Sequence, residues 1–156
     1  AGTVLSPADV EAVAGAGGRI IISPDTNPKV IRATKAAALV SLPGFFSPSE
    51  AFAALRAGAD GLKLFPADAG GLATLKALKA VLPPALPVMP VGGVDADTMA
   101  AFRAAGAGGF GIGSWLYTPG RDIEDISERA VRLVARWLSG NKRAGEAPGQ
   151  GMADGE

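Results

Sequence analysis

The sequence contains neither cysteine nor histidine, and the two absences exclude several kinds of chemistry. Without cysteine there is no disulfide framework, no thiol nucleophile and no cysteine-ligated zinc. Without histidine there is no Ser-His-Asp triad and no histidine-ligated metal, so we expect no metal site and no cofactor. Any acid-base catalysis must therefore use carboxylates, lysine, tyrosine or water.

Net charge and long apolar runs are also lacking. Fifteen basic residues balance fifteen acidic ones in a chain of 156, so nothing favours nucleic acid or an anionic membrane surface as a partner. The chain has no apolar run of membrane-spanning length and no basic-then-apolar leader. We therefore expect a cytoplasmic protein with no membrane partner and no nucleic-acid partner.

Short apolar segments alternate with helix signals along the whole chain. We expect strands at residues 1–5, 19–23, 39–42, 60–66, 87–91 and 109–113, and helices at 6–14, 27–37, 47–58, 72–82, 95–106 and 123–138. Ser6-Pro7 and Ser47-Pro48 each supply an N-cap followed by proline at the first helical position. The alternation predicts an α/β fold with a parallel sheet, either doubly wound or a (β/α) barrel.

Glycine loops after the last two strands favour the barrel, because TIM barrels build phosphate sites there. A closed barrel needs eight strands and only six are expected, the first of them resembling the end of a strand. We therefore expect an N-terminally truncated (β/α)8 TIM barrel of about six units over residues 1–139. The remaining residues are rich in glycine and polar side chains, so we expect 140–156 to be a disordered C-terminal tail.

Two glycine-rich turns follow successive predicted strands: Gly92-Gly93-Val94-Asp95 and Gly111-Ile112-Gly113-Ser114. Glycine lets the backbone approach an anion closely, and free N–H groups at a helix N-terminus favour negative charge. In a barrel the two turns are neighbours at the C-terminal face. We therefore predict one phosphate site built from Gly92, Gly93, Gly113 and Ser114. The alternative is that both turns are only tight connections.

Lys63 lies in the middle of the apolar segment 60–66. That segment resembles a strand buried on both faces, where an ammonium must be paired or lose its proton. A neutral amine is a nucleophile suited to Schiff-base formation with a carbonyl, and Phe65 would help to exclude water. The alternatives are that Lys63 pairs with Asp60 or Asp68, and that Phe65 only packs in the core. A Schiff-base lysine beside a phosphate site indicates a metal-independent aldolase acting on a phosphorylated sugar acid.

Several motifs, in order along the chain, resemble those of one enzyme family, the KDPG/KDPGal aldolases, which are class I 2-keto-3-deoxy-6-phospho-sugar-acid aldolases. The matching residues are Ala1-Gly2-Thr3-Val4-Leu5, Ile22-Ser23-Pro24, Leu42-Pro43-Gly44, Leu62-Lys63-Leu64-Phe65-Pro66, Val91-Gly92-Gly93-Val94 and Gly113-Ser114-Trp115-Leu116-Tyr117. The resemblance extends to about residue 138 and leaves out the tail.

The resemblance implies roles for particular residues. It makes Lys63 the Schiff-base lysine and gives the phosphate to the two glycine-rich turns. It places Thr3 near the pyruvate carboxylate, and Pro24 and Pro43 in the pocket wall, with Phe65 completing the substrate-binding set. The implied partner is a phosphorylated keto-deoxy sugar acid, and the implied assembly is a homotrimer.

Within the family, residues 23–28 and Val91 look more like the galactonate-specific branch, because the gluconate-specific branch tends to carry threonine before Gly-Gly. We therefore expect cleavage of 2-dehydro-3-deoxy-6-phosphogalactonate to pyruvate and D-glyceraldehyde 3-phosphate, in galactonate catabolism. Three alternatives stay open: a 2-dehydro-3-deoxy-6-phosphogluconate aldolase, a phosphate-binding barrel of other chemistry, and an inactive fragment.

The family also uses two residues that this sequence does not match. Its proton-shuttling glutamate and an anion-binding arginine lie on its first two strands, and nothing here corresponds to them. Glu11 and Glu50 are predicted on helix surfaces and do not inherit the role. Because a positioned acid-base group contributes about 10²- to 10⁴-fold in rate, we expect slow or no turnover from this chain alone.

Overall fold

The computed structural model describes residues 1–142 as an α/β chain in which every strand pairing is parallel. Five strands are assigned: β1 (Ile20–Ile22), β2 (Val40–Leu42), β3 (Gly44–Phe45), β4 (Leu62–Leu64) and β5 (Val88–Pro90). They alternate with six helices: α1 (Pro7–Gly15), α2 (Pro28–Ala36), α3 (Pro48–Arg56), α4 (Gly71–Lys79), α5 (Met99–Ala104) and α6 (Ile123–Lys142). The predicted succession of βα units is confirmed.

The strands follow one another in space in the order of the chain. β1 pairs with β2, and β3, β4 and β5 pair in that order. β2 and β3 are separated only by Pro43, whose carbonyl accepts the Lys63 N–H at 2.8 Å. Single parallel bridges join Gly2 to Ile22 and Val91 to Gly111. The result is a row of six extended segments that begins near Gly2 and ends near Gly111.

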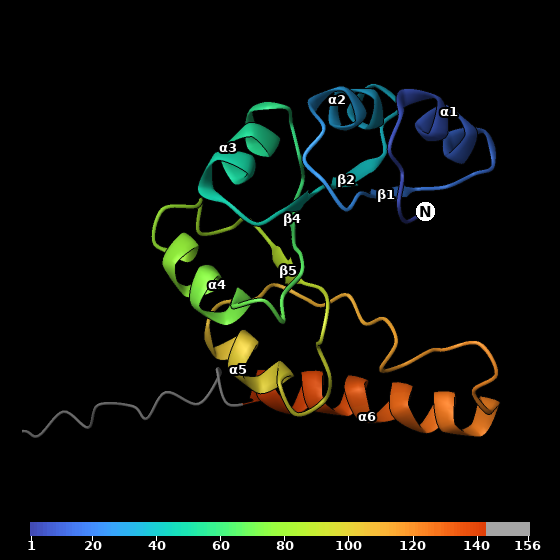
Figure 1. Ribbon diagram of the computed structural model, residues 1–156, viewed down its shortest axis with the longest axis vertical. Helices are drawn as coiled ribbons and strands as arrows, with labels where there is room; N and C mark the ends of the chain where they lie inside the picture. The colour runs from blue at the N-terminus through green and yellow to red at the C-terminus, as the bar shows by residue number, and fades with distance from the viewer. Residues whose placement is uncertain (143–156) are drawn as a thin grey trace, which may run out of the picture.

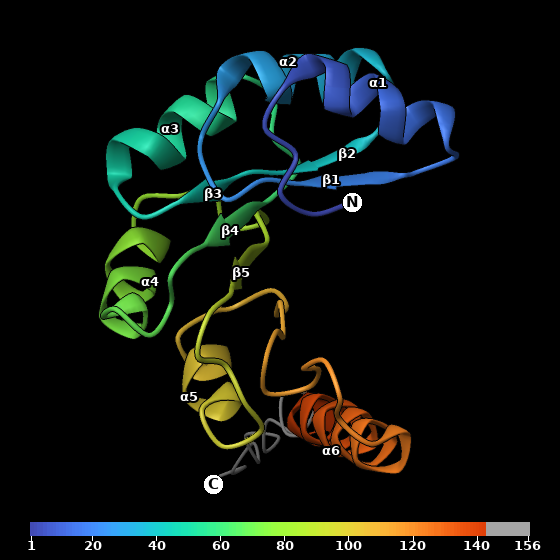
Figure 2. The same cartoon turned by 45° about the vertical axis from the view of Figure 1, so that its right-hand side comes forward.

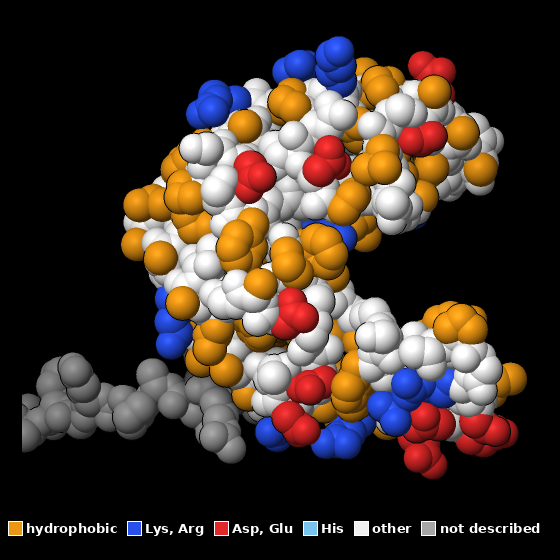
Figure 3. All heavy atoms as spheres, viewed as in Figure 1, with side chains coloured by type: hydrophobic (Ala, Val, Ile, Leu, Met, Phe, Trp, Pro, Cys, Tyr) orange, Lys and Arg blue, Asp and Glu red, His pale blue; other side chains and the backbone are white. Residues whose placement is uncertain are grey.

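This row curves into an open arc, with α1 to α4 on its outer side and α5 and α6 at its far end (Figures 1 and 2). The space-filling view shows the opening as a wide notch between the α1 end and the α6 end (Figure 3). Within residues 1–142 no ladder joins the first segment to the last. These residues therefore form a parallel, barrel-like wall rather than a closed barrel.

Local capping explains where two of the helices begin. The Ser6 hydroxyl accepts the Asp9 N–H at 3.2 Å while the Asp9 carboxylate accepts the Ser6 N–H at 2.9 Å. Ser47 and Glu50 repeat this reciprocal pair at α3, at 3.3 and 2.7 Å. In both helices proline follows the cap, as the Ser-Pro pattern predicts.

β4 and β5 bury one of their two faces fully and the other only partly. Leu62 and Leu64 have no exposed surface and pack in the main hydrophobic core, whereas Lys63 between them is only partly buried. On β2, Val40 is 43% exposed. The expectation that segment 60–66 is buried on both faces is therefore wrong, because helices cover the outer side of the arc and its inner side is open.

Four other predicted elements differ from the structure. The expected strands at 1–5 and 109–113 are each reduced to a single bridge, at Gly2 and at Gly111, and residues 108–113 have glycine at four of six positions. The expected helix at 95–106 begins only at Met99, because the Asp95 carboxylate accepts the Thr98 N–H at 2.7 Å and holds a preceding turn. α6 continues to Lys142, and the rest of the expected tail, 143–156, lies outside the described residues. No helix in residues 1–142 combines the length and apolarity needed to cross a membrane.

Candidate active site

Most of the predicted site residues other than Lys63 gather at one edge of the arc. They lie one to three residues beyond the last paired position of their segments: Thr3 after Gly2, Pro24 after Ile22, Phe65 after Leu64, Gly92 and Gly93 after Val91, and Gly113 and Ser114 after Gly111. The pairings are all parallel, so these positions share the carboxyl edge of the sheet. This is the edge at which (β/α) barrels place their active sites. Pro43 lies instead within the row, between β2 and β3 and beside Lys63.

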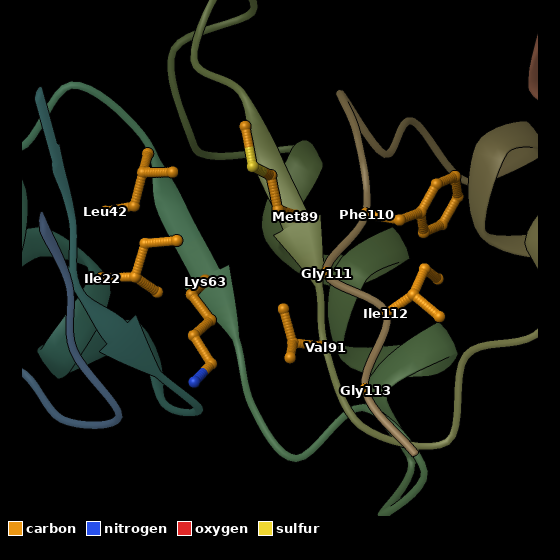
Figure 4. Close-up of a pocket in the computed structure, with 9 residues that line it drawn as sticks. All are labelled: Ile22, Leu42, Lys63, Met89, Val91, Phe110, Gly111, Ile112 and Gly113. Carbon is orange, nitrogen blue, oxygen red and sulfur yellow. The ribbon is translucent and has the colours of Figure 1, made fainter. Parts of the chain in front are cut away.

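Lys63 projects from β4 into a hollow on the inner side of the arc. The hollow has a volume of about 190 Å³ and is lined by Ile22, Leu42, Lys63, Met89, Val91, Phe110, Gly111, Ile112 and Gly113. Figure 4 shows the Lys63 side chain between Ile22 and Val91, with its amine on the side of Ile22 and Gly113 on the far side of Val91. Lys63 is the only charged side chain among these lining residues, and none of them is a carboxylate.

The Lys63 amine has no hydrogen-bond or ion-pair partner within residues 1–142. Asp60, one of the two carboxylates considered for it, instead holds Lys35 at 2.7 Å through both oxygens and accepts the Ser41 N–H at 2.8 Å. The interpretation of Lys63 as an ion-pair residue of Asp60 is therefore wrong. The other candidate, Asp68, forms no ion pair in this part of the chain.

Burial lowers the pKa of the Lys63 amine below its ordinary value of 10.5, because a low-dielectric environment disfavours the charged form. The Phe65 ring lies beneath the amine, with its centroid 4.3 Å from Nζ. A ring face attracts the ammonium and so opposes this shift. Phe65 is 37% exposed, so it covers the amine at the mouth of the site and is not a core residue.

The two glycine-rich turns present backbone donors without acceptors. Within the described chain no acceptor is found for the N–H groups of Gly93, Val94, Gly113, Ser114 and Trp115. The Gly92 N–H, in contrast, faces Gly111 in the parallel bridge between Val91 and Gly111. Gly92 and Gly93 have φ of 100° and 65°, conformations that favour glycine. Free N–H groups in glycine turns form concave sites for anions, so both turns have the chemistry that a phosphate group requires.

The structure brings some of the predicted residues together more closely than others. Lys63 and Gly113 line the same hollow, and a Cβ at Gly92 would lie 3.6 Å from the Phe65 ring. Thr3, Pro24, Gly93 and Ser114 occupy the same edge but are not among the lining residues, and neither is Pro43. Thr3 has φ of 56°, which is an unusual conformation for a β-branched residue.

Sequence reasoning missed the apolar lining of the hollow. Met89 pairs with Lys63 in the β4–β5 register and faces the same side, and Ile22 and Leu42 line the opposite wall. The signal was available in the period-two alternation of the strands, because each of these residues is flanked by positions that belong to the outer face.

Comparison with known proteins adds an independent line of evidence. The sequence model of the KDPG and KHG aldolase family matches residues 1–130. A protein of Rhizobium meliloti (strain 1021), named as a probable 2-dehydro-3-deoxy-6-phosphogalactonate aldolase, is 45% identical over 137 residues, which are 88% of this chain and 65% of that protein. The chain thus spans slightly less than two thirds of that relative.

Solved structures agree with the sequence match. A native KDPGal structure superposes with a TM-score of 0.88 at 40% identity, covering 90% of this chain and 68% of the other. A KDPG aldolase of Legionella pneumophila, crystallised with pyruvate captured as a covalent carbinolamine intermediate, gives a TM-score of 0.68 at 29% identity, covering 88% and 64%. Sequence and fold together show that this chain belongs to the KDPG and KHG aldolase family.

Proposed function

We propose that this chain carries the Schiff-base part of an aldolase that cleaves 2-dehydro-3-deoxy-6-phosphogalactonate to pyruvate and D-glyceraldehyde 3-phosphate. The observation that carries the proposal is the unpaired, partly buried amine of Lys63, which lies in a hollow bordered by a glycine turn with free N–H groups. An amine with a lowered pKa is neutral more often at a given pH, and only the neutral form attacks a carbonyl.

The reaction follows from that arrangement. The Lys63 nitrogen attacks the C2 ketone, and loss of water from the carbinolamine gives an iminium ion. When a base takes the C4 hydroxyl proton, the C3–C4 bond breaks, its electrons reach the iminium nitrogen, and glyceraldehyde 3-phosphate leaves. The remaining enamine takes a proton at C3, and water releases pyruvate and the free amine. The carbinolamine in the Legionella pneumophila relative supports the first step.

The base for the C4 proton is not provided by the residues around the hollow, because none of them is a carboxylate. Glu50 is committed to the cap of α3, where its carboxylate accepts the Ser47 and Phe46 N–H groups. Glu11 is exposed on α1. We therefore expect Schiff-base formation to be efficient and carbon–carbon cleavage to be slow in this chain, by the ~10²- to 10⁴-fold that general base catalysis supplies.

The galactonate substrate is favoured over the gluconate epimer by two observations. The galactonate-named relative and the KDPGal structure are 45% and 40% identical to this chain, against 29% for the KDPG aldolase of Legionella pneumophila. Val91 lines the hollow directly before the first glycine turn, at the position where the resemblance leads us to expect threonine in a gluconate enzyme.

The proposal also covers closure and assembly. We propose that the arc is part of an eight-stranded barrel and that the protein assembles as a homotrimer. A designed porous cage, made by fusing symmetric oligomeric domains, is 40% identical to this chain with a TM-score of 0.89, which supports an oligomeric relative. A cytoplasmic location follows from the substrate, because phosphorylated sugar acids are metabolites of the cell interior.

The test is to incubate the chain with pyruvate and borohydride and to measure its intact mass, followed by a peptide map. We expect one reduced pyruvyl adduct, on Lys63. A Lys63→Arg variant, which keeps the positive charge but cannot form the imine, should show no adduct. A Lys76→Arg variant is the matched control, because Lys76 is exposed on α4 and its loss should change nothing.

Two outcomes decide the proposal. A folded chain that gives no adduct, or an equal adduct in the Lys63→Arg variant, contradicts the Schiff-base role. Either result would favour the alternative of a phosphate-binding barrel with other chemistry. A parent chain without cooperative thermal unfolding would favour the inactive fragment. Pyruvate release from each phosphorylated epimer, followed with lactate dehydrogenase, shows whether the galactonate or the gluconate compound is the substrate.

A further inference from the structure

Two arginines, one just before α6 and one within it, hold the loop that follows Gly113. The Arg121 guanidinium donates to the Ser114 carbonyl at 3.2 Å and to the Thr118 hydroxyl at 3.4 Å. Arg129, in α6, donates to the Trp115 carbonyl at 3.1 Å and stacks on the Trp115 ring at 5.1 Å. Two successive carbonyls of this loop therefore point toward arginines.

A single carboxylate holds both arginines. One oxygen of Asp125 accepts from Arg129 at 2.8 Å, and the other accepts from Arg121 at 3.2 Å. Asp125 and Arg129 are four residues apart on one face of α6, and Arg121 lies two residues before the helix begins. The hydrogen bond from Arg129 is the largest cause that keeps the pKa of Asp125 below its ordinary value. Its negative charge offsets the repulsion between two neighbouring guanidinium groups.

The orientation of the carbonyls sets the orientation of the N–H groups. In a trans peptide the C=O and N–H bonds point in opposite directions. Because Arg121 holds the Ser114 carbonyl, the Trp115 N–H of the same peptide points away from that arginine. The Gly113 carbonyl is held without an arginine, because it accepts the Leu116 N–H at 2.9 Å and the Tyr117 N–H at 3.1 Å. The three N–H groups of residues 113–115 are left without acceptors.

We propose that Asp125 is a positioning residue for phosphate recognition: by fixing Arg121 and Arg129 it fixes the Ser114 and Trp115 carbonyls, and so holds the Trp115 N–H, and the turn that carries the Gly113 and Ser114 N–H groups, ready for the phosphoryl group. This inference rests on the proposed function, because it assigns the phosphate of the substrate to that loop. Asp125 itself does not touch the substrate.

Asp97 provides a matched control. Its carboxylate also pairs with an arginine of α6, Arg132, at 3.2 Å, but the pair is more exposed. Arg132 also lies over the Trp115 ring, at 5.9 Å, but it donates to no carbonyl of the 113–115 loop. Asp97→Asn and Asp125→Asn are thus the same chemical change, made once at a carboxylate whose arginine holds no loop carbonyl and once at the carboxylate whose two arginines do.

The test compares these variants and the rescue variant Asp125→Glu in the full chain. Affinity for inorganic phosphate is measured by calorimetry, and amide hydrogen exchange is followed in the peptide that contains residues 113–115. We expect Asp125→Asn to weaken phosphate binding about fivefold, as suits the loss of partly exposed charge-assisted bonds. It should also accelerate exchange in the loop. Asp97→Asn should change neither, and Asp125→Glu should recover part of the affinity.

The borohydride adduct at Lys63 separates this inference from the proposed function. Pyruvate carries no phosphate, so Asp125→Asn should form the adduct as the parent does. If the parent forms no adduct, the proposed function fails whatever Asp125 does. If the adduct forms normally but phosphate affinity and loop exchange are unchanged in Asp125→Asn, or the parent binds no phosphate, the positioning role is refuted. An equal loss of affinity in Asp97→Asn refutes it as well.

Discussion

Gly44 packs against the Pro24 backbone and pairs with Lys63. We predict that Gly44→Ala destabilises the chain strongly. A Cβ at this position would lie 2.2 Å from the Pro24 carbonyl oxygen, 2.3 Å from its carbon and 2.9 Å from the Asp25 nitrogen. Ordinary van der Waals separations between carbon atoms are about 3.5 to 4.0 Å. The obstructing atoms belong to the backbone, so no rotamer change relieves the overlap and one segment must move by about 1 Å.

Neither segment moves freely. Gly44 pairs with Lys63 in the β3–β4 register, and its carbonyl accepts the Thr26 hydroxyl at 2.6 Å. Overpacking of this kind costs about 1 to 3 kcal/mol, and we expect the upper end of that range. At about 2 to 4 °C per kcal/mol for a chain of this size, the melting temperature should fall by about 6 to 12 °C.

The assay is thermal unfolding followed by circular dichroism, with Gly113→Ala as the control. A Cβ at Gly113 would meet no atom within 4 Å, and this glycine does not adopt a positive φ. The control should therefore unfold within about 0.5 kcal/mol of the parent. The adduct yield at Lys63 should also fall in Gly44→Ala, because β3 sets the position of β4. Equal melting temperatures for the two variants would refute the reasoning, and a parent without a cooperative transition would contradict the structure itself.

Three further predictions concern the pKa of Lys63 and the N-cap of α3. Burial lowers the pKa of Lys63 below 10.5, so borohydride trapping should reach its half-maximal rate at a lower pH than for a free lysine; equal pH profiles would contradict this. The same shift affects stability, because burying the ammonium costs free energy below the pKa of Lys63 in the folded chain. That cost is relieved as the pH rises from this pKa toward 10.5. Stability measured by urea unfolding should therefore rise over this pH range in the parent and not in Lys63→Met. Ser47→Ala should lower the free energy of unfolding in urea by about 1 kcal/mol, because it removes the N-cap of α3. Ser49→Ala, two residues later and exposed, should lower it much less.

The features that sequence predicted well depend on neighbours in the chain. The starts of α1 and α3 follow from Ser-Pro caps with an acid three residues after the serine, and both partners lie within one turn. The order of the strands follows from the alternation of elements, since consecutive βα units place each strand beside the last. The carboxyl-edge location of most of the predicted site residues is a consequence of that order alone.

The features that sequence predicted badly depend on contacts between distant segments. Asp60 stands three residues from Lys63, yet it pairs with Lys35 of α2, 25 residues away. No local pattern distinguishes these two partners. The bonds from Arg121 and Arg129 to carbonyls of the 113–115 loop connect the start of α6 and the residues before it to an irregular segment, and no periodicity predicts them. Whether the inner side of the sheet is packed or open depends on closure of the arc, which is a property of the whole fold.

The glycines of the two turns do not support a phosphate site equally. A Cβ at Gly93 would lie 2.7 Å from the Asp68 Cβ, and one at Gly92 would lie 3.3 Å from the Ala67 nitrogen. Packing and positive φ therefore account for both residues without any ligand. Gly113 is different, because its Cβ would meet nothing, its φ is not positive, and it borders the hollow beside Lys63. Internal packing gives no reason for glycine there, whereas a group that must approach the free N–H groups of residues 113–115 does. The second turn, held by Arg121, Asp125 and Arg129, is thus the part of the edge at which our proposal of anion binding accounts for a glycine that packing does not explain.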